Sequence, residues 1–488
     1  DAEGSLLPNK IYTAVVLGTS TKNDFRFLRV WWEDVDCLQT KGGWQYFAKG
    51  GAYSQFYADV HLLIRWGGNA RELEADLLRK FPYLGANADF VLHRSNPYGN
   101  QGLTWSQRSQ KGFSMRALPA GCVFAAKGPA AFAEGSAEQL MALLALTNSS
   151  SFRFLVSLQI AFGSYNVQII QNTPVPDIPP DSLEAIALLA RQSWSFKRLL
   201  DSQEEVSHAF ALPAALLARL GDYDPPAIEA ELARIQAEID AIAFDLYGFS
   251  DGDRAAVQGD QSVANEGDAE INADDEGDDE DDASPIDHTV GLLSWALGVA
   301  FGRFDWRLAT GERAAPAEPE PFDPLPAKSP GMLPDGAVTF HANPGILVDD
   351  PGHPHDLARL IEEVLARVDV PVPEDVRRWL QRDFFAFHLQ RYSKSRRKAP
   401  IYWPLSTTSG SYTLWVYYPS LTSQTLYTAI NDFVEPKLKQ VGDDVTALRN
   451  KGSAWTRDDE KQFEALQAFE LELIELRDTL LKLAPTYK

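Results

Sequence analysis

The chain has few cysteines and no long apolar run. Its 488 residues include only Cys37 and Cys122, which lie far apart and outside any CxxC or Cys/His cluster. This usage is typical of a reducing cytoplasm, and it excludes a disulfide scaffold and a cysteine-based metal site. No apolar stretch reaches the ~18 residues of a membrane span, and there is no signal-peptide pattern. We therefore expect a cytoplasmic protein without a membrane partner.

Motifs that announce catalysis are also missing. No glycine-rich loop has the spacing of a dinucleotide or P-loop site, and no Ser/His/Asp, paired-carboxylate or nuclease-type arrangement is present. Residues 96–99 (NPYG) resemble the Asn-Pro-Pro-aromatic signature of amino-methyltransferases, but the second proline and a preceding cofactor loop are absent. His353 and His355 (HPH) could bind a metal, but residues of a Pro-rich turn on the surface are the preferred explanation. The residues alone indicate no catalytic, cofactor or metal site in this chain.

Negative charge is abundant but unevenly distributed. The formal net charge is −23, and residues 251–287 hold fifteen Asp and Glu against one Arg. Residues 272–284 (NADDEGDDEDDAS) contain too little apolar surface to fold, so we predict an acidic disordered linker at 251–285. The alternative is that this segment mimics nucleic acid and shields a basic groove.

The remaining sequence predicts an α+β protein. Residues 1–180 mix strand-like runs with helical patterns and are expected to form one α+β domain. The runs are 11–17, 25–32, 121–124 and 167–170, and the helices are 70–81, 136–148 and 150–162. Residues 181–250 are expected to be a helical spacer. In it, Leu232, Ile235, Ile239 and Ile242 share one stripe behind Pro225 and Pro226, which suit a first helical turn.

A second α+β region is expected at 286–424, followed by a helical hairpin at 425–488. We predict a buried helix at 290–301, an extended Pro-rich loop at 315–334, helices at 356–367 and 373–390, and a strand at 412–418. The hairpin is expected to be broken near Asp443 and Gly452. It should pack on the chain's own body, with a partner protein as the alternative.

Positive charge concentrates in residues 391–403 (RYSKSRRKAPIYW). Five of these thirteen residues are basic, namely Arg391, Lys394, Arg396, Arg397 and Lys398. Tyr392, Tyr402 and Trp403 interleave with them. A cationic strip with aromatic planes suits a nucleic acid, whose phosphates pair with cations and whose bases stack. The alternative is a solvated surface loop.

A second basic and aromatic concentration lies at 102–127 (GLTWSQRSQKGFSMRALPAGCVFAAK). Its candidate DNA-binding residues are Thr104, Trp105, Arg108, Lys111 and Arg116. Arginine can read guanine edges, and hydroxyl groups can contact phosphates. The alternative is a basic hairpin with Trp105 and Phe113 facing the core. Lys49 is a further candidate, because the glycine turn that follows it could approach a phosphate or could simply join two strands.

Several motifs together resemble one known family. They are WWED (31–34), KGGAYSQFY (49–57), GLTWSQRSQKGFSMR (102–116), FGSYNVQIIQNTPVPDIP (162–179), IDAIAFDLYGFS (239–250) and RYSKSRRKAPIYWPLSTTSGSY (391–412). In this order they resemble the C-terminal half of fused adenine-specific DNA methyltransferases of bacterial phage defence. These are the BREX and DISARM enzymes, akin to the methylase part of single-chain restriction-modification enzymes. The acidic linker is not part of the pattern.

The resemblance implies a division of labour. In that family an N-terminal half binds S-adenosylmethionine and carries the catalytic Asn-Pro-Pro-aromatic motif, and the C-terminal half contains a target-recognition domain, a helical spacer and a closing domain. Only the second half is matched here, so no catalytic or cofactor residue is transferred. Since the sequence begins with Asp1 rather than Met, we interpret the chain as the C-terminal part of something larger. The resemblance places 102–127 in target recognition and 162–179 on the way to the spacer.

The leading hypothesis is therefore the DNA-binding, target-recognition portion of an adenine-N6 DNA methyltransferase. Its expected partners are double-stranded DNA, a methyltransferase half (fused or separate) and other defence subunits. Arg108, Lys111 and Arg116 would read bases, and the basic residues of 391–398 would hold the DNA backbone. One alternative is a protein-interaction scaffold of a defence complex without its own DNA specificity. Another is a separate enzyme with a site near His353.

Overall fold

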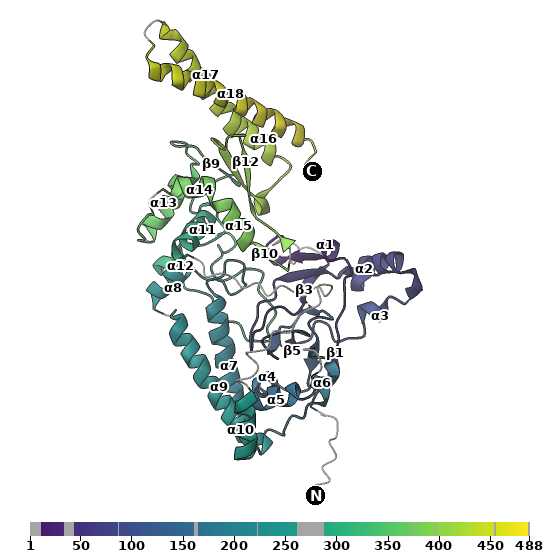
Figure 1. Cartoon of the computed structure of the whole chain (residues 1–488). Coiled ribbons are helices and arrows are strands. Elements are labelled where there is room, and N and C mark those ends of the chain that lie inside the picture. The colour runs from purple at the N-terminus through teal and green to yellow at the C-terminus, as the bar shows by residue number, and fades with distance from the viewer. Residues whose placement is uncertain are drawn as a thin grey trace. The chain divides into compact units, whose positions relative to one another are not determined.

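The chain folds into two compact units of mixed helix and strand (Figure 1). The structure is a computed structural model that describes residues 11–33, 43–85, 87–160, 164–221, 223–260, 287–373, 375–395, 397–452 and 455–486. Unit 1 consists of residues 1–285 and 315–330, and unit 2 consists of 286–314 and 331–488. Helices pack on small, mainly antiparallel sheets in each unit, which confirms the α+β class.

Unit 1 contains two four-stranded sheets. The first has the order β1-β8-β5-β6 with antiparallel neighbours throughout. The second has the order β2-β4-β3-β7, in which only the β3–β7 pair is parallel. The strands are β1 (Ala14–Val16), β2 (Leu28–Val30), β3 (Trp44–Ala48), β4 (Leu62–Arg65), β5 (Gly102–Trp105), β6 (Met115–Leu118), β7 (Val123–Phe124) and β8 (Ala130–Phe132).

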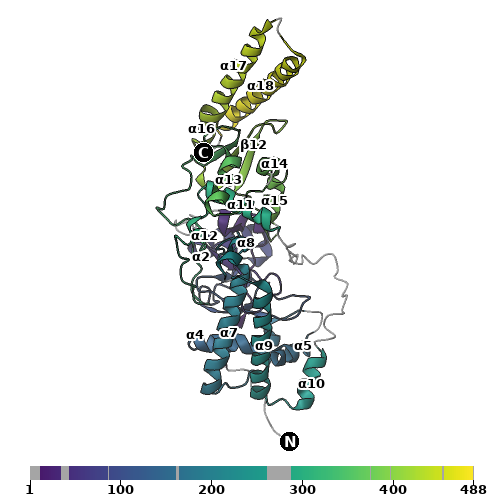
Figure 2. The ribbon, with the colours of Figure 1, turned by 90° about the vertical axis from the view of Figure 1, so that its left-hand side faces the viewer.

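Helices make up the rest of unit 1, and the two longest, α7 and α9, run side by side (Figures 1 and 2). The helices are α1 (Asp24–Phe27), α2 (Gly67–Lys80), α3 (Asp89–Leu92), α4 (Ala137–Asn148), α5 (Ser150–Ser157), α6 (Val167–Asn172), α7 (Pro180–Asp201), α8 (Ala214–Leu220), α9 (Pro225–Tyr247) and α10 (Asp251–Asp260). Short 3-10 turns occur at Trp31–Glu33 and Pro82–Leu84.

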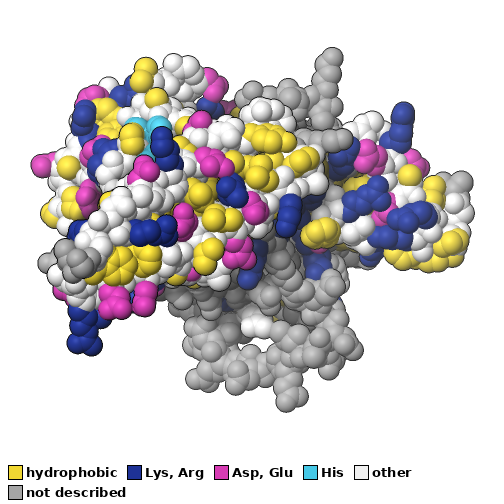
Figure 3. Space-filling view, turned by 90° about the horizontal axis from the view of Figure 1, so that it is seen from above, with side chains coloured by type: hydrophobic (Ala, Val, Ile, Leu, Met, Phe, Trp, Pro, Cys, Tyr) yellow, Lys and Arg dark blue, Asp and Glu magenta, His cyan; other side chains and the backbone are white. Residues whose placement is uncertain are grey.

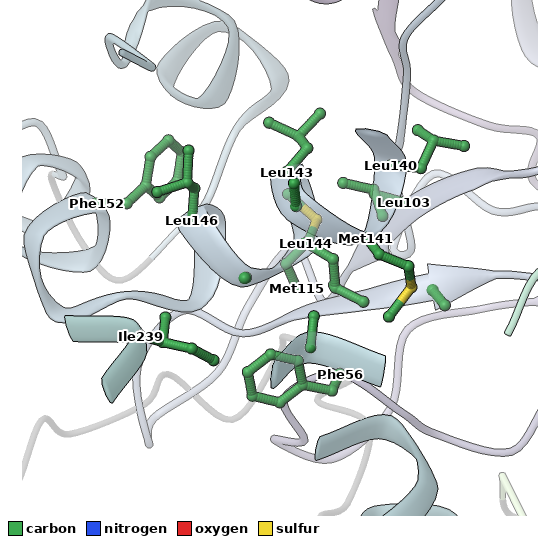
Figure 4. Packing of buried hydrophobic residues seen from close by; sticks show 14 of the residues in the cluster. Phe56, Leu103, Met115, Leu140, Met141, Leu143, Leu144, Leu146, Phe152 and Ile239 are labelled. Atoms are coloured by element: carbon green, nitrogen blue, oxygen red, sulfur yellow. The ribbon is translucent and has the colours of Figure 1, made fainter. Parts of the chain in front are cut away.

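The core of unit 1 forms around α4. The Ser136 hydroxyl caps this helix by accepting a hydrogen bond from the Gln139 backbone amide, and the Ser136 backbone amide donates to Gln139 Oε1. Because α4 is apolar on nearly every face, strands contact it on one side and helices on the other. Figure 4 shows this packing, with residues of β5, β6, α5 and α9 around those of α4. Each fully buried aliphatic side chain contributes roughly 1.5–3 kcal/mol.

Unit 2 combines a three-stranded sheet, order β12-β13-β9, with helices and a small hairpin, β10–β11. The strands are β9 (Ile346–Asp349), β10 (Ser393–Lys394), β11 (Arg397–Lys398), β12 (Tyr402–Ser406) and β13 (Thr413–Tyr417). The helices are α11 (His288–Ala300), α12 (Arg307–Thr310), α13 (Leu357–Arg367), α14 (Val376–Arg382), α15 (Phe384–Arg391), α16 (Thr425–Thr428), α17 (Glu435–Asn450) and α18 (Arg457–Leu483). A π-helical turn, Ala429–Val434, joins α16 to α17.

The C-terminal helices α17 and α18 lie side by side as a hairpin (Figures 1 and 2). One apolar cluster joins this hairpin to the sheet of unit 2, since it includes Val348 and Leu414 of the strands together with Val441 and Leu473 of the helices. The hairpin therefore packs on its own unit, as predicted.

No single helix in the described part of the chain is long and apolar enough to span a membrane. The bent pair α4 and α5 reaches that length and composition only when the two are taken together, and both helices contribute to the core of unit 1.

Three local predictions were wrong. Residues 167–170 form the start of α6 instead of a strand, because the turn after Asn166 lets Ile170 pack into the core. Residues 25–32 begin with the helical turn α1 and end in a 3-10 turn, which leaves β2 only three residues. The helix expected at 373–390 is two helices, α14 and α15, that meet at Asp383.

The predicted positions of two interruptions, one in the helical hairpin and one at the acidic segment, were also wrong. Asp443 lies inside α17, and the hairpin turns only after Asn450. At the start of the predicted acidic linker, residues 251–260 form α10 rather than a disordered segment, because the Ser250 hydroxyl caps the helix through the Asp253 amide and Val257 is buried. Residues 261–286 lie outside the described ranges.

Candidate nucleic-acid interface

The basic strip folds as a hairpin on a buried base. Tyr392, at the end of α15, is fully buried, and its carbonyl accepts a hydrogen bond from the Ala399 amide at 2.8 Å, which closes the hairpin. β10 and β11 pair Ser393 with Lys398 and Lys394 with Arg397. Ser395 takes a left-handed φ of 50° at the turn. The two short strands thus hold three of the predicted cations, and Arg396 lies outside the described residues.

A neutral histidine fixes the chain beneath this hairpin. His388 is fully buried, and its Nε2 accepts hydrogen bonds from the amides of Ile401 (2.9 Å) and Tyr402 (3.2 Å). Burial lowers the pKa of His388 well below its usual value, and the charge of Arg303 lowers it further. Because the ring stays neutral, Nε2 keeps the lone pair that these two amides require.

Positive charge extends from the hairpin to the preceding helices. Residues 376–403 contain eight Arg and Lys and one acidic residue, Asp383. On α14, Arg378 and Arg382 are exposed, whereas Arg377 pairs with Asp349 and with Asp356, the latter at 2.7 Å. Figure 3 shows basic and acidic side chains interspersed over the face seen there.

An exposed aromatic ring accompanies the cations. Trp403 on β12 is 45% exposed, its Nε1 donates to the Pro400 carbonyl at 2.9 Å, and its ring lies 6.1 Å from that of Phe385. Tyr392 and Tyr402, by contrast, are buried and unable to stack on a ligand. Of the three aromatic residues predicted to interleave with the cations, only Trp403 can offer a ring face to a base.

The region 102–127 divides into buried and exposed residues. Trp105 is fully buried, its Nε1 donates to the Tyr165 carbonyl at 2.8 Å, and its ring packs near Phe113. Thr104 is 7% exposed, and its hydroxyl donates to the Pro129 carbonyl at 2.8 Å. Both lie on β5, which has a neighbouring strand on each side. Trp105 and Thr104 are therefore core residues, and the interpretation that placed the two aromatic rings of this region in the core holds.

Arg116 is also buried, on β6. Its Nη1 donates to the Gly50 carbonyl at 3.3 Å and its Nη2 contacts the Ser106 hydroxyl. Among the described residues no carboxylate reaches it, and burial lowers the pKa of its guanidinium to about 10. With an exposure of 4%, Arg116 cannot read a base edge in this structure.

Arg108 and Lys111 are exposed, as DNA contacts require. They lie on residues 106–112, in the loop that joins β5 to β6. The loop is held at its start, where the Gln107 amide donates to the Lys127 carbonyl at 2.9 Å and Gln107 Nε2 donates to Asn166 at 3.3 Å. These two residues are the part of the predicted base-reading set that remains accessible.

Lys49 follows β3 and makes an ion pair with Asp24 at 2.7 Å. Burial raises the pKa of Asp24, but hydrogen bonds from Lys49 and Thr21 outweigh it, and the net effect is a lowered pKa. Lys127, which ends the predicted region without having been a candidate, is exposed beside this pair and adds to the lowering. The run AAKG after a strand was the only sequence signal for it.

The NPYG segment has a structural part in unit 1. The Asn96 side-chain Nδ2 donates to the Leu17 carbonyl at 2.6 Å, and the Tyr98 hydroxyl donates to the Leu92 carbonyl at 3.0 Å. The Tyr98 ring packs between those of Trp66 and Phe124. These contacts leave the asparagine amide engaged with its own chain.

Histidines gather near His353 without forming a metal centre. His341 Nε2 and His355 Nδ1 are 2.7 Å apart, and the His353 ring stacks on Phe433. In the parts of the chain that the structure describes, no group of three His, Cys, Asp or Glu side chains is arranged to hold a metal ion.

A second polar network is buried in unit 1. His208 stacks on Trp31, and its ring nitrogens contact Asp59 (2.7 Å) and the Tyr46 hydroxyl (3.1 Å). Nearby, the Asp201 carboxylate accepts hydrogen bonds from the Tyr57 hydroxyl at 3.2 Å and from Ser207. Burial and the charge of Asp59 raise the pKa of Asp201 to about 7. The network joins the β3 region to the end of α7.

The chain is similar in sequence to adenine-specific methyltransferases. BrxX of Escherichia coli O9:H4 (strain HS) is 24% identical in an alignment that covers 90% of this chain and 38% of that protein. PglX of Lacticaseibacillus casei (strain Zhang) is 24% identical over 257 residues, which cover 48% of this chain and 21% of that protein. The chain thus spans less than two fifths of the length of either relative. No protein-family model matches it.

Among solved structures, the chain is similar to the Type IIL restriction-modification enzyme MmeI, solved in complex with DNA. The match covers 53% of this chain and 36% of that one, at 13% identity and a TM-score of 0.35. A likeness at that level does not establish a common fold.

Proposed function

We propose that this chain is the DNA-binding, target-recognition portion of an adenine-N6 DNA methyltransferase of bacterial phage defence. The observation that carries the proposal is the β10–β11 hairpin, with Lys394, Arg397 and Lys398 on two short strands, followed along the chain by the exposed Trp403. The similarity to adenine-specific methyltransferases supports the same role. A duplex would be its partner, together with a methyltransferase half that is fused or separate and other subunits of the defence system.

The proposed mechanism divides the cations between two tasks. The hairpin would contact backbone phosphates. Arg391, at the end of α15, and Arg378, on α14, precede the hairpin in the sequence and would contact phosphates with it. Such contacts hold a duplex in register without reading its sequence. Arg108 and Lys111 would contact base edges from the loop 106–112, where arginine and lysine commonly bind guanine.

Methyl transfer itself would depend on residues outside this chain. S-adenosylmethionine is the methyl donor of the family, and the Asn-Pro-Pro-aromatic motif has no counterpart at any position here. The residues that resemble it most, 96–99, are engaged with their own chain through Asn96 and Tyr98. The proposal therefore leaves cofactor binding and methyl transfer to the methyltransferase half, and this chain would position the duplex while a base is flipped elsewhere.

The test is duplex binding across a salt series. A fluorescently labelled duplex is titrated with the wild type, with Arg397→Ala/Lys398→Ala, and with Lys461→Ala/Lys482→Ala as a control that removes two exposed cations from α18. Each lost phosphate contact lowers the slope of log affinity against log salt by about 0.9, so the hairpin variant should lose roughly two units. The control should keep the wild-type slope.

A protein-interaction scaffold is the second candidate. Leu471 on α18 is 68% exposed, and Leu481 and Leu483 near the end of that helix are about half exposed, at 46% and 49%. Apolar side chains of this kind suit a protein partner. Wild-type protein that binds no duplex even at low salt would favour this function over DNA recognition.

A further inference from the structure

Three loops of unit 1 that are far apart in the sequence meet at one place. Residues 49–52 follow β3, residues 106–112 follow β5, and residues 125–128 follow β7. The Ser106 hydroxyl donates to the Gly51 carbonyl at 2.6 Å, and the Gln107 amide donates to the Lys127 carbonyl. A Cβ on Gly128 would lie 2.6 Å from the Gly50 nitrogen, so this close approach requires glycine.

The turn at 50–51 exposes backbone donors. Gly50 and Gly51 have φ values of 97° and 114°, which L residues rarely adopt, and both Gly51 and Ala52 are exposed. Within the described residues, the amides of Gly51 and Ala52 donate no hydrogen bond to any other group. Successive free N–H groups at a glycine turn are a common way for a protein backbone to hold an anion.

The buried guanidinium of Arg116 lies directly behind this turn. Its Nη1 is 3.9 Å from the position that a Cβ on Gly51 would occupy, and its Nε has no partner among the described residues. Burying a cation without a carboxylate is costly, because the interior does not replace its hydration. An anion seated on the turn would offset this cost.

Cations outnumber acids around the turn. Lys49 and Lys127 flank it, and Asp24 is the carboxylate that pairs with Lys49. The Asp24 side chain is 51% exposed, so it can leave the lysine when a stronger anion arrives. The arrangement therefore offers two ammonium groups and two backbone amides to a single ligand, with the buried guanidinium of Arg116 behind them.

We propose that the Gly50–Gly51 turn, with Lys49, Lys127 and Arg116, is a phosphate-binding site that holds one backbone phosphate of DNA. The lysines and the amides of Gly51 and Ala52 contact the phosphate oxygens, and Arg116 acts from behind as a fixed positive charge. This inference rests on the proposed DNA-binding function and adds a contact on unit 1. Arg116 is a positioning residue here, in place of the base-reading role predicted from the sequence.

Lysine footprinting tests the site on the intact chain. The protein is acetylated briefly alone, with a duplex of about 30 base pairs, and with inorganic phosphate, and each lysine is then quantified by mass spectrometry. The duplex should protect Lys49 and Lys127 several-fold and leave Lys461, which lies beside acidic residues on α18, unprotected. In parallel, Lys127→Gln should lower the salt slope of duplex binding by about one unit, with Lys461→Gln unchanged.

The outcomes separate this site from the proposed function. A chain that binds duplex with a steep salt slope but modifies Lys49 and Lys127 at the same rate with and without DNA would overturn the site and leave the function standing. Protection by inorganic phosphate but not by duplex would make the turn a site for a small anion, which also overturns the proposal. A chain that binds no duplex contradicts the function, and this inference falls with it.

Discussion

Replacing Asp201 by asparagine should change the pH dependence of stability. In the folded chain the pKa of Asp201 is about 7, against an ordinary value of 3.8. At a pH between these two pKa values, the folded state therefore holds a proton that the unfolded state has already released. Stability from this group is complete below pH ~4 and is lost as the pH rises through 7.

The magnitude follows from the size of the shift. One pKa unit corresponds to about 1.4 kcal/mol, so a rise in pH from 5 to 8 removes roughly 2–3 kcal/mol of stability at Asp201. Asparagine carries no titratable proton and can still contact the Tyr57 and Ser207 hydroxyls. Asp201→Asn should thus be the more stable protein at pH 8 and should lack this part of the pH dependence.

Thermal unfolding at pH 5, 6.5 and 8 measures the effect. At the ~2 °C per kcal/mol typical of large domains, the difference in Tm between variant and wild type should change by about 5 °C over this range. Asp177→Asn, which replaces an exposed carboxylate, is the matched control and should follow the wild type. If Asp201→Asn and the wild type lose stability in parallel from pH 5 to pH 8, the buried-carboxylate reasoning is refuted.

Two further substitutions test the core of unit 1. Trp105→Ala should lower the free energy of unfolding by ~3–5 kcal/mol, because the ring is buried. Trp105→Phe should keep duplex affinity. A Trp105→Phe protein that loses affinity with an unchanged Tm would mean that the ring stacks on DNA. Gly18→Ala should lower the free energy of unfolding in urea by at least ~1–3 kcal/mol, because its Cβ would lie 1.9 Å from the Phe124 carbonyl oxygen. An unchanged free energy of unfolding would show that β7 can move aside.

Periodic segments with local caps were predictable from the sequence. The stripe of α9 and its proline start, the cap of α4 at Ser136, and the helix that follows Asp356 need only neighbours within a few residues. Residues 167–170 were predicted to be a strand because β-branched residues favour strands. They form a helix instead, because Ile170 packs into a core built from residues distant in the sequence.

The candidate site was only partly predictable, for the same reason. The charge of residues 391–398 is visible as a run, and the hairpin presents it. Arg116 was predicted to be an accessible cation, because a buried arginine normally has an acidic partner. The sequence gives no sign that this arginine is buried without one. Lys127 joins Lys49 only because loops separated by more than seventy residues meet behind β3 and β7, which no local pattern records.

The return of residues 315–330 to unit 1 limits how this chain can be divided. Phe322 fills the core of unit 1 and its carbonyl accepts from the Ala120 amide at 3.0 Å, while the Pro326 carbonyl accepts from Tyr46 at 3.2 Å. A fragment that stops at residue 285 would lose these contacts and expose apolar surface. Exchange of unit 1 between relatives would therefore need both of its segments to be moved together, and a single crossover at the acidic segment would yield a chimaera in which residues 315–330 do not match the rest of unit 1.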